Sequence, residues 1–132
     1  MSVFTYGSVE LESSDETEDE FSIVTVLLAP SSRTILSSDS NKSVSAGDNL
    51  GTIYLDATAA DCRVTFLPTL AQAGKKFEVT FIRKDTTANN GSVSIDGTSG
   101  GDIVQLSQQG VAYSIEATGA ALRVISSWIT PQ

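Results

Sequence analysis

The clearest pattern along the chain is an alternation of apolar and polar side chains in residues 74–85. Successive side chains of a strand point to opposite faces. One face of this segment therefore carries three apolar side chains, those of Phe77, Val79 and Phe81. Residues 92–97, 111–116 and 122–125 continue the alternation after polar turns. This half of the chain is predicted to form an antiparallel β meander, an architecture that indicates binding or assembly.

Short segments of the same kind recur through the C-terminal part of the chain, with Gly, Asn, Asp or Pro in nearly every gap. Strands are predicted at Gly51–Asp56, Cys62–Leu67, Lys76–Lys84, Ser92–Asp96, Ile103–Leu106, Val111–Glu116 and Leu122–Ser127. Asn90-Gly91 is the strongest turn signal, because both residues tolerate a positive φ. Only residues 57–60 and 70–73 indicate helix. The sequence thus predicts an all-β fold, a compact antiparallel β-sandwich or barrel-like module.

The N-terminal part differs from this module. Residues 21–28 are rich in β-branched and aromatic side chains and end shortly before Pro30, which predicts a strand, with a further strand at residues 3–9 left open. Residues 37–47 contain five serines and have the composition of a linker. We therefore divide the chain into an extended N-terminal arm with an acidic run and a Ser-rich linker, residues 1–48, and a β module, residues 49–132.

Charge is concentrated in the arm. The formal net charge of the 132 residues is −8, and seven of the sixteen acids, with no base among them, lie within eleven residues: Glu10, Glu12, Asp15, Glu16, Glu18, Asp19 and Glu20. Such a run either stays solvated, because like charges repel, or docks on a basic surface of a partner. Calcium binding is disfavoured, because the run lacks the glycine and terminal glutamate of an EF-hand loop. With no basic stripe, the chain is not expected to bind nucleic acid.

Neither a membrane nor secretion is indicated by the sequence. No segment reaches the roughly 18 uninterrupted apolar residues that a membrane-spanning helix requires. The first residues lack the basic and apolar regions of a secretory signal. We expect a soluble protein made in a cytoplasm.

Several kinds of chemistry are excluded by residue content. The chain has no histidine, which removes Ser-His-Asp and Cys-His catalysis and the commonest zinc ligand. Cys62 is the only cysteine, so it forms no internal disulfide, and we expect it to be buried. The three carboxylates that could converge for glycoside hydrolysis, Asp85, Asp96 and Asp102, lie near turns, where aspartate usually forms the turn itself. We expect no catalytic, cofactor-binding or metal-binding residues and no enzymatic activity.

The aromatic residues fall into three groups. Phe66, Phe77 and Phe81 are in phase with other inward residues and are predicted to lie in the core. A second group carries a polar atom on each ring and is a candidate for subunit contacts: Tyr54, Tyr113 and Trp128. Phe4, Tyr6 and Phe21 flank the acidic run, and we expect them, together with its acids, to contact another chain.

The order of motifs in residues 49–125 resembles a β module of tailed-bacteriophage structural proteins. The matching segments are Asn49–Asp56, Val64–Pro68 with its Leu-Pro end, the Gly74-Lys75 turn leading into Phe77–Phe81, the Lys84-Asp85 turn, Val93–Gly97 and Val111–Ser114. Such modules occur in tail fibres, spikes and head decoration proteins, commonly as trimers. This sequence departs from the pattern at its end, where Gly119 is followed by Leu122 and tryptophan comes only at Trp128.

The resemblance implies a trimeric virion structural protein. Because fibres and spikes usually carry this module within longer chains, we favour a head decoration or cement protein on the capsid exterior, with the major capsid protein as its partner. One rival is a tail-fibre or spike component that presents loops 86–91 and 98–101 to a host glycan. The other is a carboxylate-dependent glycan hydrolase.

Overall fold

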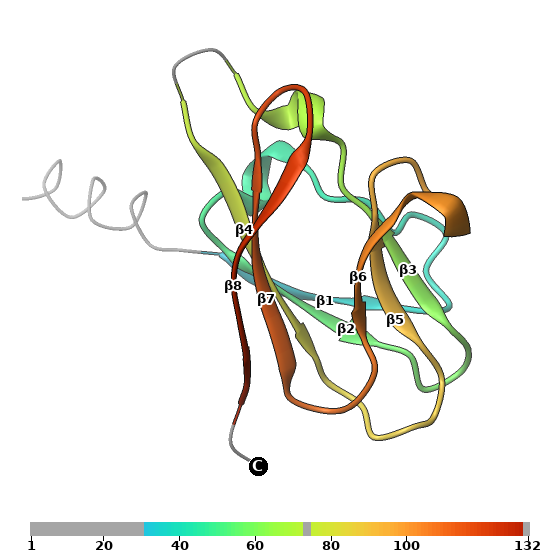
Figure 1. Ribbon diagram of the computed structural model, residues 1–132. Helices are drawn as coiled ribbons and strands as arrows, with labels where there is room; N and C mark the ends of the chain where they lie inside the picture. The colour runs from blue at the N-terminus through green and yellow to red at the C-terminus, as the bar shows by residue number, and fades with distance from the viewer. Residues whose placement is uncertain (1–30, 73–74, 131–132) are drawn as a thin grey trace, which may run out of the picture.

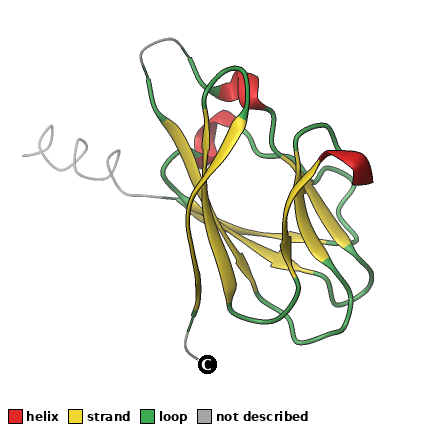
Figure 2. Cartoon of the chain, in the orientation of Figure 1, coloured by secondary structure: helices red, strands yellow, loops and turns green. Residues whose placement is uncertain are grey.

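The computed structural model describes residues 31–72 and 75–130, which form eight strands and three short 3-10 helices (Figure 1, Figure 2). The strands are β1 (Ser32–Leu36), β2 (Thr52–Asp56), β3 (Cys62–Thr65), β4 (Phe77–Arg83), β5 (Gly91–Ser94), β6 (Asp102–Leu106), β7 (Val111–Ala117) and β8 (Leu122–Ile129). The 3-10 helices are η1 (Ala46–Asp48), η2 (Pro68–Leu70) and η3 (Ser99–Gly101). The prediction of an all-β chain is confirmed.

The strands form two sheets that face each other (Figure 1). The larger sheet has five strands in the order β1-β2-β4-β7-β8, and the smaller has three in the order β3-β5-β6. In the described part of the chain neither sheet closes into a barrel, so the sandwich alternative is the correct one.

The strictly antiparallel arrangement expected from the sequence is wrong. The pairs β1–β2, β2–β4 and β3–β5 are parallel, whereas β4–β7, β7–β8 and β5–β6 are antiparallel. The reason is that the chain changes sheets at each step from β2 to β5. A strand of the other sheet thus separates β2 from β4, which run in the same direction. Asn90 accordingly precedes β5, which begins at Gly91 in the opposite sheet, so the pair does not join a hairpin with β4, and neither residue has the predicted positive φ.

The core lies between the sheets and follows the predicted alternation. In β4 every second side chain is buried, from Phe77 to Arg83. The Phe66 ring lies 5.9 Å from the Phe77 ring and 5.8 Å from the Phe81 ring, measured between centroids. These three residues are buried, which confirms their assignment to the core.

The described part of the predicted arm, residues 31–48, belongs to this sandwich. It contributes β1, a strand that the sequence analysis did not identify, and places Ile35 and Val44 in the core. The prediction of helix at residues 57–60 is wrong, because the backbone groups there bond to a neighbouring loop. Ala57 N donates to Asp85, and Ala57 O accepts from Asn89. At residues 70–73 the only helical structure in the described residues is the end of η2.

Candidate functional site

The partner-binding residues predicted from the sequence lie outside the described residues. They are Phe4, Tyr6, Glu10, Glu12, Asp15, Glu16, Glu18, Asp19, Glu20 and Phe21. Their role remains a prediction.

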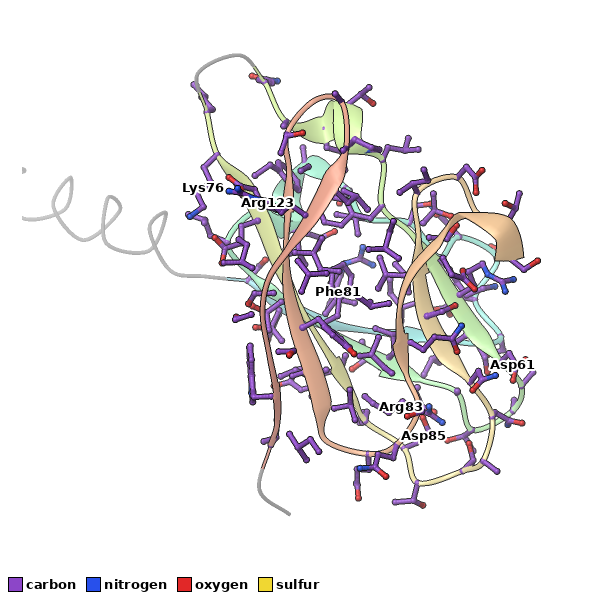
Figure 3. The ribbon with its side chains drawn as sticks, viewed as in Figure 1. Asp61, Lys76, Phe81, Arg83, Asp85 and Arg123 are labelled. Atoms are coloured by element: carbon purple, nitrogen blue, oxygen red, sulfur yellow. The ribbon has the colours of Figure 1, made fainter. Side chains whose placement is uncertain are left out.

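Asp85, one of the three carboxylates considered for catalysis, forms an ion pair with a buried arginine. The fully buried Arg83 donates to Asp85 over 2.6 and 3.0 Å, and Figure 3 shows the two side chains together at the β4–β5 loop. The same guanidinium donates to the carbonyl oxygens of Leu106 and Asn89, each at 2.5 Å. The hydrogen bonds from Arg83 hold the pKa of Asp85 far below its usual range. This network ties the loop to both sheets.

The other two carboxylates also have structural partners. Asp102 accepts from Arg63 Nε at 2.9 Å, across the β3–β5–β6 sheet. Asp96 accepts from the backbone and side chain of Thr98 at 2.9 and 2.7 Å, which shapes the turn before η3 and lowers the pKa of the carboxyl group. All three aspartates thus form ion pairs or turns, as expected of Asp in loops.

Cys62 is completely buried, as predicted, and its thiol lies 3.7 Å from the carbonyl oxygen of Ile35. Burial raises the pKa of the thiol to about 11, because the thiolate would lose its hydration. At neutral pH the group is therefore a protonated core side chain.

The two loops proposed to bind a glycan do not lie together. Loop 86–91 leads into β5 and loop 98–101 follows it, so they lie at opposite ends of that strand (Figure 1). A polar hollow of about 440 Å³ lies near the second loop, and three charged side chains line it: Lys42, Asp61 and Arg63. Each of them has a partner within the sandwich, respectively Asp39 O, Asn90 N and Asp102.

The most distinctive surface of the described residues is the edge strand β8. Seven of its eight residues are exposed, and four of those are large and apolar. The exposed fractions are 40% for Val124, 45% for Ile125, 42% for Trp128 and 61% for Ile129. Edge strands of this kind offer unpaired backbone groups to another chain, and natural proteins usually protect them. We call these four residues with their strand the β8 edge.

The β8 edge is exposed because the sheets differ in width. Val124 and Ile129 pair with Ile115 and Val111 of β7, so they share the face that is turned toward the small sheet. That sheet has three strands against five, and no described strand of it covers this end of the larger sheet. The pairing register shifts between Ser114 and Ile115, which marks a β-bulge in the pairing with β8.

On its other face the large sheet carries two distinct rows. One consists of hydroxyl side chains aligned across all five strands: Ser32, Thr52, Thr80, Ser114 and Ser126. The next row is mostly apolar and ends at the β8 edge: Thr34, Tyr54, Ile82, Ala112 and Trp128. Apolar side chains therefore flank the β8 edge on both faces of the sheet.

Basic side chains lie at the end of the large sheet where β8 begins. Glu78 and Glu116 are directly opposite in neighbouring strands, and each is paired with a base, Lys76 at 3.1 Å and Arg123 at 2.6 Å. Figure 3 shows Lys76 and Arg123 toward the same end of the molecule. Lys75 lines a hollow there with Lys76 and Glu116.

Sequence reasoning placed a strand at 122–127 but did not identify its edge position. A signal was available, because residues 124–129 carry apolar side chains at both odd and even positions. Such a strand is apolar on both faces. Only the strand order shows that no described strand covers one of its edges.

No protein-family model, curated protein or solved structure matches the chain. None of the helical turns in residues 31–72 and 75–130 has the length and apolar character that crossing a bilayer requires. Within the same ranges, no three His, Cys, Asp or Glu side chains are grouped as a metal ion would need.

Proposed function

We propose that the protein is a bacteriophage virion structural protein, specifically a homotrimeric head decoration or cement protein. It is made in the host cytoplasm, binds the major capsid protein on the capsid exterior and stabilises the shell. It acts without catalysis, metal or cofactor. The resemblance of residues 49–125 to phage structural modules supports this assignment.

The β8 edge is the observation that carries the proposal. An apolar strand of eight residues, with one edge that no described strand covers, suits contact with another protein chain. Two of the carboxylates considered for catalysis, Asp85 and Asp102, are instead engaged in internal pairs with Arg83 and Arg63. A protein with this distribution is better suited to assembly than to binding a small polar ligand.

The arm supplies the second contact in this proposal. Its acids attract a basic capsid surface, while Phe4, Tyr6 and Phe21 hold the complex once it has formed. Exposed charges more than about 10 Å apart are largely screened at 0.1 M salt. Association should therefore slow as salt rises, whereas dissociation should change less.

Binding to purified capsids that lack this protein tests the proposal. The full chain should bind at a fixed stoichiometry, and deletion of residues 1–20 should abolish binding while the sandwich stays folded. Replacing Asp15, Glu16, Glu18, Asp19 and Glu20 by Asn or Gln should lower the on-rate more than it raises the off-rate. Normal capsid occupancy by the truncated protein would contradict the role of the arm.

The trimer is tested separately by sedimentation of the free protein at micromolar concentration. We expect three times the mass of one 13.9 kDa chain. A mass near that of the single chain would contradict the trimer.

The rival functions predict different results in the same set of assays. A tail-fibre or spike component would bind host cells and not isolated capsids. A glycan hydrolase would release sugar, and mutation of Asp85, Asp96 or Asp102 would abolish the release without unfolding the protein.

A further inference from the structure

Within residues 31–72 and 75–130, the β8 edge lacks the usual protection of an edge strand. Its one charged residue, Arg123, is paired with Glu116 of the neighbouring strand β7, and Leu122–Ile129 contains no proline. In place of charges the strand exposes four large apolar side chains. Long, apolar edges of this kind are aggregation sites unless another strand covers them.

We propose that the segment Phe21–Leu28 of a neighbouring copy adds to β8 as a sixth strand of the large sheet. This segment has eight residues, as does β8, and is the most strand-like part of the arm. Phe21, Ile23 and Leu27 alternate with Val24, Val26 and Leu28, so both of its faces are apolar. A strand with two apolar faces fits beside β8, where Ile129 lies on one face of the sheet and Trp128 on the other.

The segment cannot reach β8 of its own chain. Ser32 at the start of β1 is aligned with Ser126 of β8, four strands away across the sheet. At a strand spacing of about 4.8 Å, the position beyond β8 is roughly 24 Å from Ser32. The four residue steps from Leu28 to Ser32 span at most about 14 Å. The added strand must therefore come from another copy.

Charge predicts the direction of the added strand. The acidic run ends at Glu20, immediately before Phe21. Three bases, Lys75, Lys76 and Arg123, lie where β8 begins and outnumber the two acids that pair with them, Glu78 and Glu116, which leaves a net charge of +1 there. Placing Phe21 beside Leu122 brings these opposite charges together, so the segment runs parallel to β8. In this register Thr25 lies next to Ser126.

Strand exchange of this kind is a head-to-tail contact, because each copy donates one segment and accepts another. Such contacts close into rings when the rotation between copies allows it, and a trimer is one such ring. The inference rests on the self-association in the proposed function and not on capsid binding. It assigns Phe21 to the contact between copies, which leaves Phe4 and Tyr6 for the capsid.

Disulfide trapping between full-length chains tests the exchange. Thr25→Cys and Ser126→Cys chains, distinguished by a mass tag and co-expressed, should form a disulfide-linked heterodimer under mild oxidation. The chain with both substitutions should be linked into the complete oligomer. The native Cys62 is buried and is kept in every variant, so the wild-type chain measures any disulfide formation through Cys62. Ser99→Cys, on an exposed turn of the small sheet, replaces Ser126→Cys as the matched control and should not link.

Three outcomes of the trapping experiment would overturn the exchange. They are Ser126→Cys chains linked to each other, a link within one chain of the double variant, and no link in the mixed sample. The first outcome would indicate pairing of two β8 edges. A heterodimer from chains that fail to bind capsids would uphold the exchange and reject the decoration role, so the two proposals fail separately.

A second measurement does not depend on disulfides. Ile125→Lys with Ile129→Lys places charges at two exposed positions of the β8 edge, so the sandwich should fold normally while the sedimentation mass falls to one chain. Leu67→Lys is the matched control, since Leu67 is similarly exposed but lies outside β8. An unchanged mass in the double variant would contradict the exchange.

Discussion

Replacing Arg83 by methionine should be the most destabilising polar substitution in the described sandwich. Methionine preserves much of the aliphatic length but removes the charge and every donor. Asp85, whose side chain is only 6% exposed, then loses its ionic partner. The carbonyl oxygens of Leu106 and Asn89 lose their hydrogen bonds to the guanidinium.

The expected loss follows from these partners. Breaking a buried ion pair by removing one member costs about 3–5 kcal/mol. Asp85 keeps hydrogen bonds from Ala57 N and from Thr87, which limits the cost of its remaining charge. Each carbonyl group left unsatisfied in the interior adds about 1–3 kcal/mol. Since the remaining hydrogen bonds of Asp85 offset part of these costs, we expect Arg83→Met to lower the free energy of unfolding by at least about 3 kcal/mol, a large share of the 5–15 kcal/mol typical of a domain.

Urea denaturation of the wild type, Arg83→Met, Asp85→Asn and the double variant measures this loss and the coupling between the two side chains. The sum of the losses from the two single variants should exceed the loss from the double variant, because both single variants break the same pair. Lys84→Met is a matched control, because Lys84 is exposed at the next position. A loss below about 1 kcal/mol for Arg83→Met would fall short of the cost of breaking a buried ion pair and would refute the reasoning. A double-variant loss equal to the sum of the two single-variant losses would also refute it.

The pH dependence gives an independent check on Asp85. Its pKa is lowered in the folded protein, so its contribution to stability is complete above the unfolded pKa of about 3.9 and is lost as the pH falls below that value. The stability of the wild type should therefore decline more steeply below pH ~4 than that of Asp85→Asn. Identical slopes for the two proteins would contradict this assignment.

Two further predictions concern the core. Phe66→Ala should cost about 3–5 kcal/mol in urea denaturation, because a buried ring is lost, and Phe66→Leu should cost less; equal losses would show that the site collapses around either side chain. Cys62 should resist alkylation at pH 8 in the native protein and react fully in denaturant, since its thiol is buried and has a pKa of about 11. Rapid native labelling would contradict its placement.

The strands and the core aromatics were predictable because they depend on local periodicity. Alternation identified Phe77 and Phe81 as inward residues, and every predicted strand between Gly51 and Ser127 corresponds to one in the structure. Strand β1 was missed, because Ser32–Leu36 has one buried residue, Ile35, and polar neighbours that obscure the pattern. The Asn90-Gly91 signal marked the loop before β5, but neither residue has a positive φ, and the strand that follows pairs in the other sheet.

The candidate site was less predictable than the fold. Composition located an acidic arm and indicated a structural role. It could not show which surface of the sandwich is left without a partner among the described residues. Trp128 was assigned to a subunit contact because of its amphipathic ring, and the structure places it on the exposed β8 edge. Val124 and Ile129 have no polar side-chain atom that would suggest a subunit contact, and the two-faced apolar pattern of residues 124–129 was their only signal in the sequence.

The sequence alone determined the all-β class, most strand positions, the inward aromatic residues and the concentration of charge before residue 21. These properties depend on neighbouring residues, since side-chain alternation and charge density are local. Tertiary structure decided the strand order, the parallel pairs, the buried Arg83–Asp85 pair and the exposure of β8. Such features arise from contacts between residues far apart in the chain, and a strand's local pattern is the same whether its edge is covered or open.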